Sequence, residues 1–492
     1  MSAVAMNHIA IVGGGFSGSM AAVNLARLSE VPLRVTLINQ GYPQGRGVAY
    51  STKRPEHLLN VAARNMSALP EHPNHFVEWL RTRTEFADTP DAELRETFMP
   101  RRIYGDYVRS LTLYYTRPLD QRWKVETTFV DEEAVDIAVA ENGARIVLAN
   151  GRTIDADKVL LATGNEMPAE LPGSEVLASH HAYAANPWLN WEARQPAPTD
   201  KIILLGTGLT AVDAIVTILA LGWKGTIYAV SRNGLLPQSH FKGLDHPDFP
   251  PSDVDLAKLG LARLVDLVKE YCEHLRAAGE NPAIVVDKMR PHTQRVWQAF
   301  SLAERQAFVA RYAARWNVMR HRIAQPVHRQ LTMAAKEGRL RIVRGAVTRL
   351  EPQGEQIRVH LERAAGEAEN EHAPAAIDGA LVINCTGPQT RFSATRSPLL
   401  RNLLASGAVQ PDAMDMGIRI DSEFTAIERN GRPSRFLYVI GPPLRGTLWE
   451  SIAVPELRGQ ALRVAQVMLA GAARVPPAWT KEAESSVIEY WI

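Results

Sequence analysis

Residues 8–28 decide the fold, and they read HIAIVGGGFSGSMAAVNLARL. The stretch opens with an apolar run too short for a helix and closes with a helical pattern, so it predicts a strand, a turn and a helix. The turn is Gly13-x-Gly15-x-x-Gly18, the dinucleotide-binding fingerprint in the context that it requires. Its glycines let the backbone approach a pyrophosphate, and the helix N-terminus attracts phosphate. We expect this turn, including Phe16 and Ser17, to bind a dinucleotide.

The second strand of this unit, residues 33–38, ends at Asn39 and Gln40. Dinucleotide sites usually carry Asp or Glu here, which binds the adenosine ribose. An amide can still bind a ribose hydroxyl, although as a neutral and weaker acceptor. We therefore expect Asn39 and Gln40 at the ribose.

The same plan recurs in the middle of the chain. An apolar run at 201–205 leads into a second fingerprint, Gly206-x-Gly208-x-x-Ala211, in which Leu209 and Thr210 begin the next helix. Ser231 and Arg232 follow the next strand, where an NAD site would carry an acid. Arginine suits a 2′-phosphate, which favours NADPH over NADH. A solvated surface charge is the alternative for Arg232.

Each glycine turn is followed by polar, strand-rich segments and then by an apolar strand that runs into Thr-Gly, at Thr163-Gly164 and at Thr386-Gly387. This ordered repetition indicates a duplication. Residues 253–337 instead have mainly helical periodicity. We predict an α/β fold with two Rossmann-like dinucleotide-binding domains, antiparallel meanders and a helical insertion.

Composition narrows the function classes. The chain has 492 residues and a formal net charge of only +2, which argues against a dedicated nucleic-acid binder. Its 46% hydrophobic residues are enough to bury sizeable cores. Cys272 and Cys385 are far apart and form no CxxC, so neither a local redox disulfide nor a metal site is expected. Residues 202–223 are strongly apolar, but Gly206, Gly208 and Asp213 favour a buried strand and helix over a membrane span. The N-terminus lacks the order of a signal peptide, which predicts a cytoplasmic protein.

Nearly the whole sequence resembles the two-dinucleotide-binding-domain flavoproteins. More specifically, it is similar to bacterial FAD/NAD(P)-binding oxidoreductases that are distantly related to flavin-containing and N-hydroxylating monooxygenases. The closer resemblance is carried by residues 45–50, 57–61, 66–70, 100–105, 206–213, 382–388 and 445–457.

This resemblance implies that FAD occupies the N-terminal site and NADPH the middle one. The FAD-binding domain would comprise 1–165 and 389–492, and the NADPH-binding domain 166–388. The cofactor-contacting residues that it implies, beyond those of the two turns, are Gly47, Leu59, Asn60, Val61, Met66, Thr163, Gly164, Gly441 and Trp449.

Two of these assignments, Asn60 and Trp449, have alternatives, and Pro442 departs from related proteins. Asn60 followed by Met66 is similar to a monooxygenase run in which the Asn lies by the flavin, but Asn60 could equally cap a turn. Pro442 stands where related proteins often carry an Asp that contacts the flavin ribityl chain. Trp449 could face the flavin or lie in the core, which is the commoner fate of tryptophan.

His180 and His181 lie in a degenerate match to the linker signature of such monooxygenases. With Asn60, they are the catalytic candidates; linker residues without chemistry are the alternative reading for the two histidines. No further ligand at suitable spacing supports a metal site there.

The resemblance implies an FAD-dependent oxidoreductase reduced by NADPH. Without a CxxC, dioxygen is the leading electron acceptor, which indicates a monooxygenase acting through a flavin C4a-hydroperoxide on a small molecule such as an amine or amino acid. The alternatives are an NADPH-dependent reductase that passes electrons to a quinone or protein, and a flavin-binding sensor with little turnover. No nucleic-acid or membrane partner is expected, and homo-oligomerisation stays open.

Overall fold

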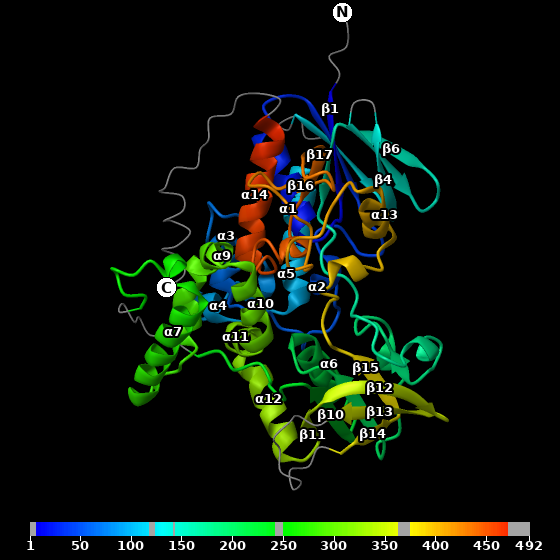
Figure 1. Ribbon diagram of the computed structural model, residues 1–492, viewed down its shortest axis with the longest axis vertical. Coiled ribbons are helices and arrows are strands. Elements are labelled where there is room, and N and C mark those ends of the chain that lie inside the picture. Colours follow the sequence, from blue (N-terminus) through cyan, green and yellow to red (C-terminus); the bar gives the residue numbers. More distant parts are fainter. Residues whose placement is uncertain (1–5, 118–123, 141–142, 242–248, 363–373, 471–492) are drawn as a thin grey trace, which may run out of the picture.

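The computed structural model describes residues 6–117, 124–140, 143–241, 249–362 and 374–470. It contains two large sheets, the first in the upper half of Figure 1 and the second in the lower half. Each large sheet is accompanied by a three-stranded antiparallel meander. The predicted α/β fold with two Rossmann-like domains is confirmed.

The first sheet has the order β16-β17-β7-β1-β2-β3 and is parallel except for the β16–β17 pair. Its strands are β1 (Asn7–Val12), β2 (Leu33–Ile38), β3 (Val125–Val130), β7 (Lys158–Leu161), β16 (Thr425–Ile427) and β17 (Pro433–Val439). The helices α1 (Phe16–Leu28), α5 (Arg101–Tyr115) and α14 (Val454–Ala470) share its larger core. The opposite core is completed by α13 (Pro398–Ser406) and by the meander β4 (Ala134–Ala140), β5 (Gly143–Leu148) and β6 (Thr153–Ala156). Sequence-distant segments therefore build one layered domain around β1.

The second sheet has the order β11-β10-β9-β15-β8 and is entirely parallel. Its strands are β8 (Tyr183–Ala184), β9 (Lys201–Leu205), β10 (Thr226–Ser231), β11 (Leu340–Arg344) and β15 (Leu381–Asn384). One core contains α6 (Leu209–Ala220) and α12 (Gln325–Lys336); the other contains the meander β12 (Ala346–Gln353), β13 (Gln356–Glu362) and β14 (Ala376–Gly379). The apolar run at 202–223 is thus the buried β9–α6 unit, as predicted.

The two glycine turns have the same geometry. A Cβ built on Gly13 would lie 2.2 Å from the carbonyl oxygen of Ala162, and one built on Gly206 would lie 2.2 Å from that of Cys385. Both glycines have positive φ, +110° and +122°, so any side chain would be excluded by space and by backbone conformation. In both units the turn contacts the residue that precedes Thr-Gly, which is the structural counterpart of the repeat seen in the sequence.

The helical insertion lies between β10 and β11. It consists of α7 (Gly260–Ala277), α8 (Ile284–Met289), α9 (Thr293–Ala299), α10 (Leu302–Arg311) and α11 (Ala313–Arg320). Its apolar core includes Trp449, which comes from the segment before α14. The insertion therefore leaves the second sheet and packs on the first domain, on the left of Figure 1.

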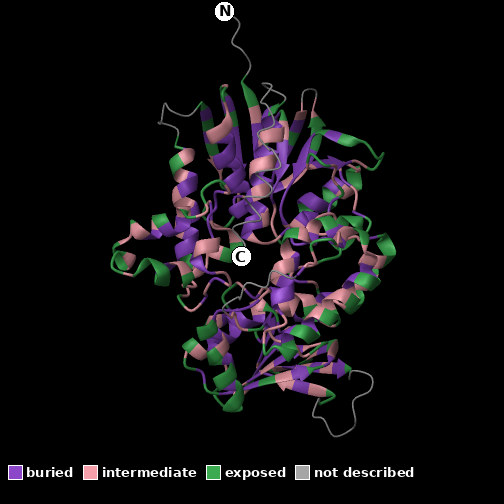
Figure 2. Ribbon diagram, turned by 90° about the vertical axis from the view of Figure 1, so that its left-hand side faces the viewer, coloured by how far each residue is buried: buried purple, intermediate pink, exposed green. Residues whose placement is uncertain are grey.

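Three short helices complete the first domain: α2 (Gly47–Tyr50), α3 (His75–Arg81) and α4 (Asp91–Glu96). Figure 2 shows that buried residues run through both sheets, whereas exposed residues gather on the outer helices and loops. Among the helices in the described ranges, none has the length and apolar character needed to cross a membrane.

Candidate functional site

A cleft of about 670 Å³ lies where the two domains and the insertion meet. The first domain contributes Tyr50, Asn60, Met66 and the residues that lead into α14. The second contributes the turn after β9 and the end of β10, and α11 of the insertion closes a third side. The second glycine turn thus borders one cavity with Leu59, Asn60, Val61 and Met66, the residues expected near the flavin, although the two segments are far apart in the sequence.

The first glycine turn presents the N-terminus of α1. Gly15 and Gly47 face each other, since a Cβ on Gly47 would lie 3.1 Å from the Gly15 Cα. The hydroxyl of Thr163, beside this turn, is buried and has no hydrogen-bond partner among the described residues. Free helical N–H groups, two glycines and an unpaired hydroxyl fit the pyrophosphate of a dinucleotide.

Asn39 has its polar atoms engaged by the backbone. Its Oδ1 accepts a hydrogen bond from the Gly14 N–H at 2.9 Å, and its Nδ2 donates to the carbonyl of Tyr42. Gln40 is exposed next to it. Asn39 therefore braces the glycine turn, and a ribose contact would have to share its amide or come from Gln40.

The second turn is open toward the cleft. A Cβ on Gly208 would meet nothing within 4 Å, and Leu209 and Thr210 line the cavity. The Ser231 hydroxyl accepts hydrogen bonds from Thr207 Oγ1 at 2.9 Å and from the Gly234 N–H at 3.1 Å, so it fixes the loop. This loop is thereby held beside the N-terminus of α6, where phosphate is favoured.

Arg232 is the exposed cation of this loop. It lines the cleft and makes no ion pair or hydrogen bond with any residue that the structure describes. A guanidinium without an internal partner is available to an anionic ligand, such as a 2′-phosphate.

Asn60 lines the cleft beside Leu59, Val61 and Met66, with Leu59 and Met66 buried. Its carbonyl accepts a hydrogen bond from His240 Nε2 at 2.8 Å. Burial, with the nearby Arg322, lowers the pKa of His240 to about 4, so the ring is neutral at pH 7 and Nε2 carries the proton. His240 was not a sequence candidate, because an isolated histidine 180 residues from its partner has no motif.

Gly441 lies next to the first glycine turn: a Cβ there would be 3.2 Å from Ser17 Oγ. The Gly441 N–H donates to Gln460 Oε1 of α14 at 2.9 Å, and the Gly441 carbonyl accepts from the Ser451 hydroxyl. Residues 452–455 line the cleft just where α14 begins. The N-terminus of α14 is therefore directed to favour negative charge in this cavity.

Trp449 lies in the core of the insertion and is 3% exposed. Its ring centroid is 4.7 Å from that of Trp297 and 5.4 Å from that of Phe308. Trp449 lines a second, apolar cavity and is not among the residues that line the cleft. Of the two readings of Trp449, the structure favours the core.

His180 and His181 are not brought to the cleft. His180 Nε2 lies 3.1 Å from the carbonyl of Gly354, and His181 Nε2 lies 3.3 Å from Glu355 Oε2. Their rings stack at a centroid distance of 4.9 Å. Both histidines thus face the turn between β12 and β13, away from Asn60.

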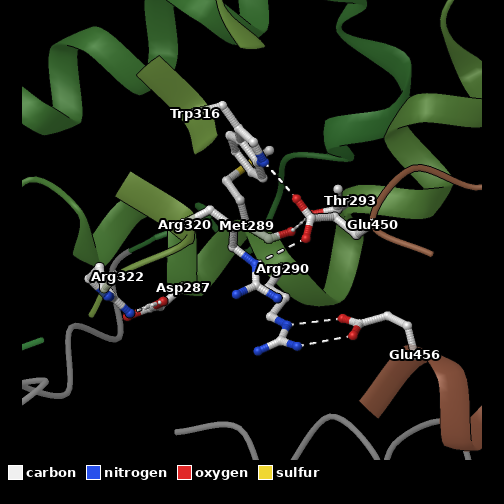
Figure 3. Close-up of polar contacts among 9 residues, drawn as sticks. All are labelled: Asp287, Met289, Arg290, Thr293, Trp316, Arg320, Arg322, Glu450 and Glu456. Carbon is white, nitrogen blue, oxygen red and sulfur yellow. Dashed lines mark hydrogen bonds and ion pairs between the residues drawn. The ribbon is translucent and has the colours of Figure 1, made fainter. Parts of the chain in front are cut away.

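A polar cluster joins the insertion to the start of α14 (Figure 3). Arg290 binds Glu456 through two 3.0 Å hydrogen bonds. Glu450 accepts a 2.8 Å hydrogen bond from Trp316 Nε1 and lies 3.2 Å from Arg320. The contacts of Trp316 and Arg320 fix α11 to Glu450, and the Arg290–Glu456 pair ties the insertion to the start of α14.

Burial opposes the negative charge of Glu450, yet Arg320, His321 and the Trp316 N–H outweigh it, and the pKa of Glu450 is lowered. Burial also lowers the pKa of His321 to about 4. Glu450 is therefore anionic and His321 neutral at pH 7, so this wall of the cleft combines a charged pair with an uncharged imidazole.

Comparison with known proteins fits this arrangement. Residues 10–166 match a family model described as FAD-NAD(P)-binding. This match identifies an FAD/NAD(P)-binding domain in the first third of the chain. No curated protein matches the sequence.

Solved structures share the fold over nearly full length. The ornithine hydroxylase of Pseudomonas aeruginosa has a TM-score of 0.63 at 16% identity, covering 95% of this chain and 100% of that one. The ornithine N-hydroxylase of Kutzneria sp. 744, solved with reduced FAD, NADP⁺ and L-ornithine, has a TM-score of 0.61 at 15% identity, with coverages of 95% and 100%. The L-lysine 6-monooxygenase of Pseudomonas syringae has a TM-score of 0.61 at 15% identity, with coverages of 94% and 99%. The chain therefore has the fold of the two-dinucleotide-binding-domain flavoproteins.

Proposed function

We propose that the protein is an FAD- and NADPH-dependent monooxygenase that acts on a small amine or amino acid. The observation that carries this proposal is the cleft that the second dinucleotide-binding turn shares with Asn60, Met66 and the start of α14 in the first domain, with the helical insertion as its third wall. A cavity bordered by both domains would bring the two cofactor rings together for hydride transfer and leave room for a substrate beside them.

The chain offers a distinct set of groups to each cofactor. The N-terminus of α1, with Gly15, Gly47 and Thr163, would hold the FAD pyrophosphate. The N-terminus of α6 and Arg232 would hold the phosphates of NADPH. When bound, the flavin supplies the redox chemistry, accepting a hydride and reacting with dioxygen.

The remaining residues of the cleft would position the rings and exclude water. Asn60 and the N-terminus of α14 border the first domain's side of the cavity, where they would stabilise negative charge on the reduced ring. Asn317 and His321 border the opposite side on the insertion. A substrate amine would therefore contact the neutral imidazole of His321 and the amide of Asn317 rather than an unpaired carboxylate.

The choice of dioxygen as acceptor rests on two considerations. Cys272 is in α7 and Cys385 follows β15, and both are free and buried, so these two thiols form no dithiol pair. The solved structures with the same fold include an ornithine N-hydroxylase, a lysine 6-monooxygenase and, at a TM-score of 0.54, a cadaverine monooxygenase from Erwinia amylovora. These support an amine-directed oxygenase over a disulfide reductase.

The proposal is tested by rapid mixing. The FAD-loaded protein is reduced with one equivalent of NADPH without oxygen and is then mixed with oxygenated buffer. We expect bleaching of the flavin, then a transient near-ultraviolet absorbance before the oxidised spectrum returns, with a longer lifetime when NADP⁺ is present. A Gly208→Asp variant serves as the control, because it should keep FAD and lose reduction by NADPH.

Direct return to oxidised flavin with stoichiometric peroxide, and no oxygenated product from a panel of amines and amino acids, would instead support a reductase. Absence of any bleaching by NADPH would support a sensor.

A further inference from the structure

The helical insertion encloses a second cavity of about 260 Å³. Its interior is formed by apolar side chains from all the helices of the insertion; they include Leu264, Val285, Met289, Phe300 and Phe308. Protein interiors are normally packed with few voids larger than a water molecule. Apolar cavities of comparable size bind small hydrocarbons.

The helix α11 separates this cavity from the cleft. Tyr312, Trp316 and Met319 line the apolar cavity, whereas Asn317 and Val318 line the cleft. Trp316 and Met319 are three residues apart, so they lie on one face of α11, and Tyr312 caps its N-terminus on the same side of the cavity. The insertion therefore presents two different walls, and the apolar cavity is a site of its own.

Trp449 lines this cavity, and its one polar side-chain atom is buried without a partner in the part of the chain that the structure describes. The Nε1–H of Trp297 donates to the carbonyl of Gly446 at 2.9 Å, and that of Trp316 donates to Glu450. Trp449 is 3% exposed, and its Nε1–H has no acceptor among the described residues. A buried donor without an acceptor is costly, so an incoming acceptor would be favoured there.

The cavity also reaches the surface. Lys269, Glu273, Arg276 and Arg315 contribute to its lining, and all four are exposed. They lie on α7 and α11 and form a charged rim around the apolar interior. A small molecule could enter between these two helices without opening the core of either domain.

We propose that this cavity is a binding site for a small aromatic or branched aliphatic molecule that carries one hydrogen-bond acceptor, such as a carbonyl. The apolar walls bind the body of the molecule, and Trp449 Nε1–H donates to its acceptor. The site is separate from the cleft, and the proposal does not depend on the monooxygenase function.

The test is calorimetric titration of the full-length, FAD-loaded protein with acetophenone and with ethylbenzene, which differ by one carbonyl oxygen. We expect one saturable site for acetophenone. Trp449→Phe keeps an aromatic ring but removes the donor, so it should weaken acetophenone about 5- to 10-fold and change ethylbenzene binding by less than about 2-fold.

A second pair of variants tests the location. Val268→Phe adds volume to the cavity wall and should abolish binding of both compounds, whereas Leu302→Phe, an exposed position on α10, should leave it unchanged. Val265→Phe replaces Val268→Phe if the latter does not fold. The proposal is overturned if the unmutated protein shows no saturable binding. It is also overturned if the folded Val268→Phe protein, or Val265→Phe in its place, binds both compounds unchanged. Equal weakening of both compounds by Trp449→Phe overturns the role of the indole N–H.

Discussion

Arg101 Nη1 lies 2.6 Å from Asp213 Oδ2, and this ion pair joins the first residue of α5 in one domain to α6 in the other. Both side chains are largely buried, with 13% and 9% of their surface exposed. Arg101 Nε also donates to the carbonyl of Leu58, and His57 Nε2 lies 2.8 Å from Thr217 Oγ1. This polar junction fixes how the second sheet is placed against the first, and with it the shape of the cleft.

We expect Asp213→Leu to destabilise the protein by about 3–5 kcal/mol, because it leaves the Arg101 charge buried without a partner. The double variant Arg101→Met/Asp213→Leu should recover most of this loss, since no lone charge remains. The measurement is the urea midpoint of unfolding. Asp155→Asn, in the exposed Arg145–Asp155 pair, is the control and should have the unmutated midpoint. An Asp213→Leu midpoint equal to that of the control would contradict a structural role for the junction.

The two glycine turns should be separable by substitution. Gly15 and Gly208 both have negative φ, and a Cβ at either position meets no protein atom closer than 3.7 Å. Aspartate is therefore tolerated by the fold but places a negative charge before a phosphate. Gly15→Asp should abolish the yellow absorbance of the purified protein, whereas Gly208→Asp should keep it and lose reduction by NADPH. If a folded Gly15→Asp protein retained FAD, the assignment of FAD to the first glycine turn would be wrong.

Arg232 should determine the preference for NADPH. Loss of a charge-assisted hydrogen bond costs about 1.5–3 kcal/mol, so Arg232→Ala should lower kcat/KM for NADPH by roughly 10- to 100-fold and leave that for NADH nearly unchanged. Arg341→Ala is the matched control, because Arg341 is also exposed on this sheet but does not line the cleft. Equal efficiency with NADPH and NADH in the unmutated protein would refute the assignment.

The sequence predicted those features of the molecule that are local. Each glycine turn follows a short apolar strand and precedes a helix, so a few neighbouring residues specify it, and the spacing of the Thr-Gly strands then predicted the repeat. The contacts that shape the cleft join residues with no relation in the sequence: Arg101 and Asp213 are 112 positions apart, and Asn60 and His240 are 180. Asn39 illustrates a further limit, because residue type alone does not tell whether an amide binds a ligand or the adjacent backbone.

Acid should destabilise the folded protein through His240, whose Nε2–H donates to the Asn60 carbonyl. Its pKa is about 4 in the folded protein and 6.5 in the unfolded chain, so between these values the unfolded state binds more protons and stability falls as the pH is lowered. The loss between pH 7 and pH 5 should be about 2 kcal/mol, and none should arise from this group above pH 7. His240→Gln, which can still donate to Asn60, should reduce the pH dependence of the urea midpoint by this amount. An unchanged slope in His240→Gln would show that His240 is not buried as a neutral ring.

The catalytic candidates from the sequence should differ in effect. Asn60 borders the cleft, whereas His180 and His181 contact Gly354 and Glu355 on another face of the second domain. Asn60→Ala should lower the rate of substrate-dependent NADPH oxidation by about tenfold or more, as for other groups that orient or stabilise a reacting ring. The double variant His180→Ala/His181→Ala should stay within about twofold of the unmutated rate. A large loss of this rate in the double variant would show that His180 or His181 takes part in the reaction.

The two faces of α11 also constrain which sequence changes this helix can accept during evolution. A point substitution at Asn317 alters only the cleft, and one at Met319 alters only the apolar cavity, so selection can change either wall alone. A single inserted or deleted residue would rotate everything after it by about 100° around the helix axis. It would exchange parts of the two walls at once and displace Arg320 from Glu450. Related chains should therefore vary freely in residue type along this helix while preserving its length.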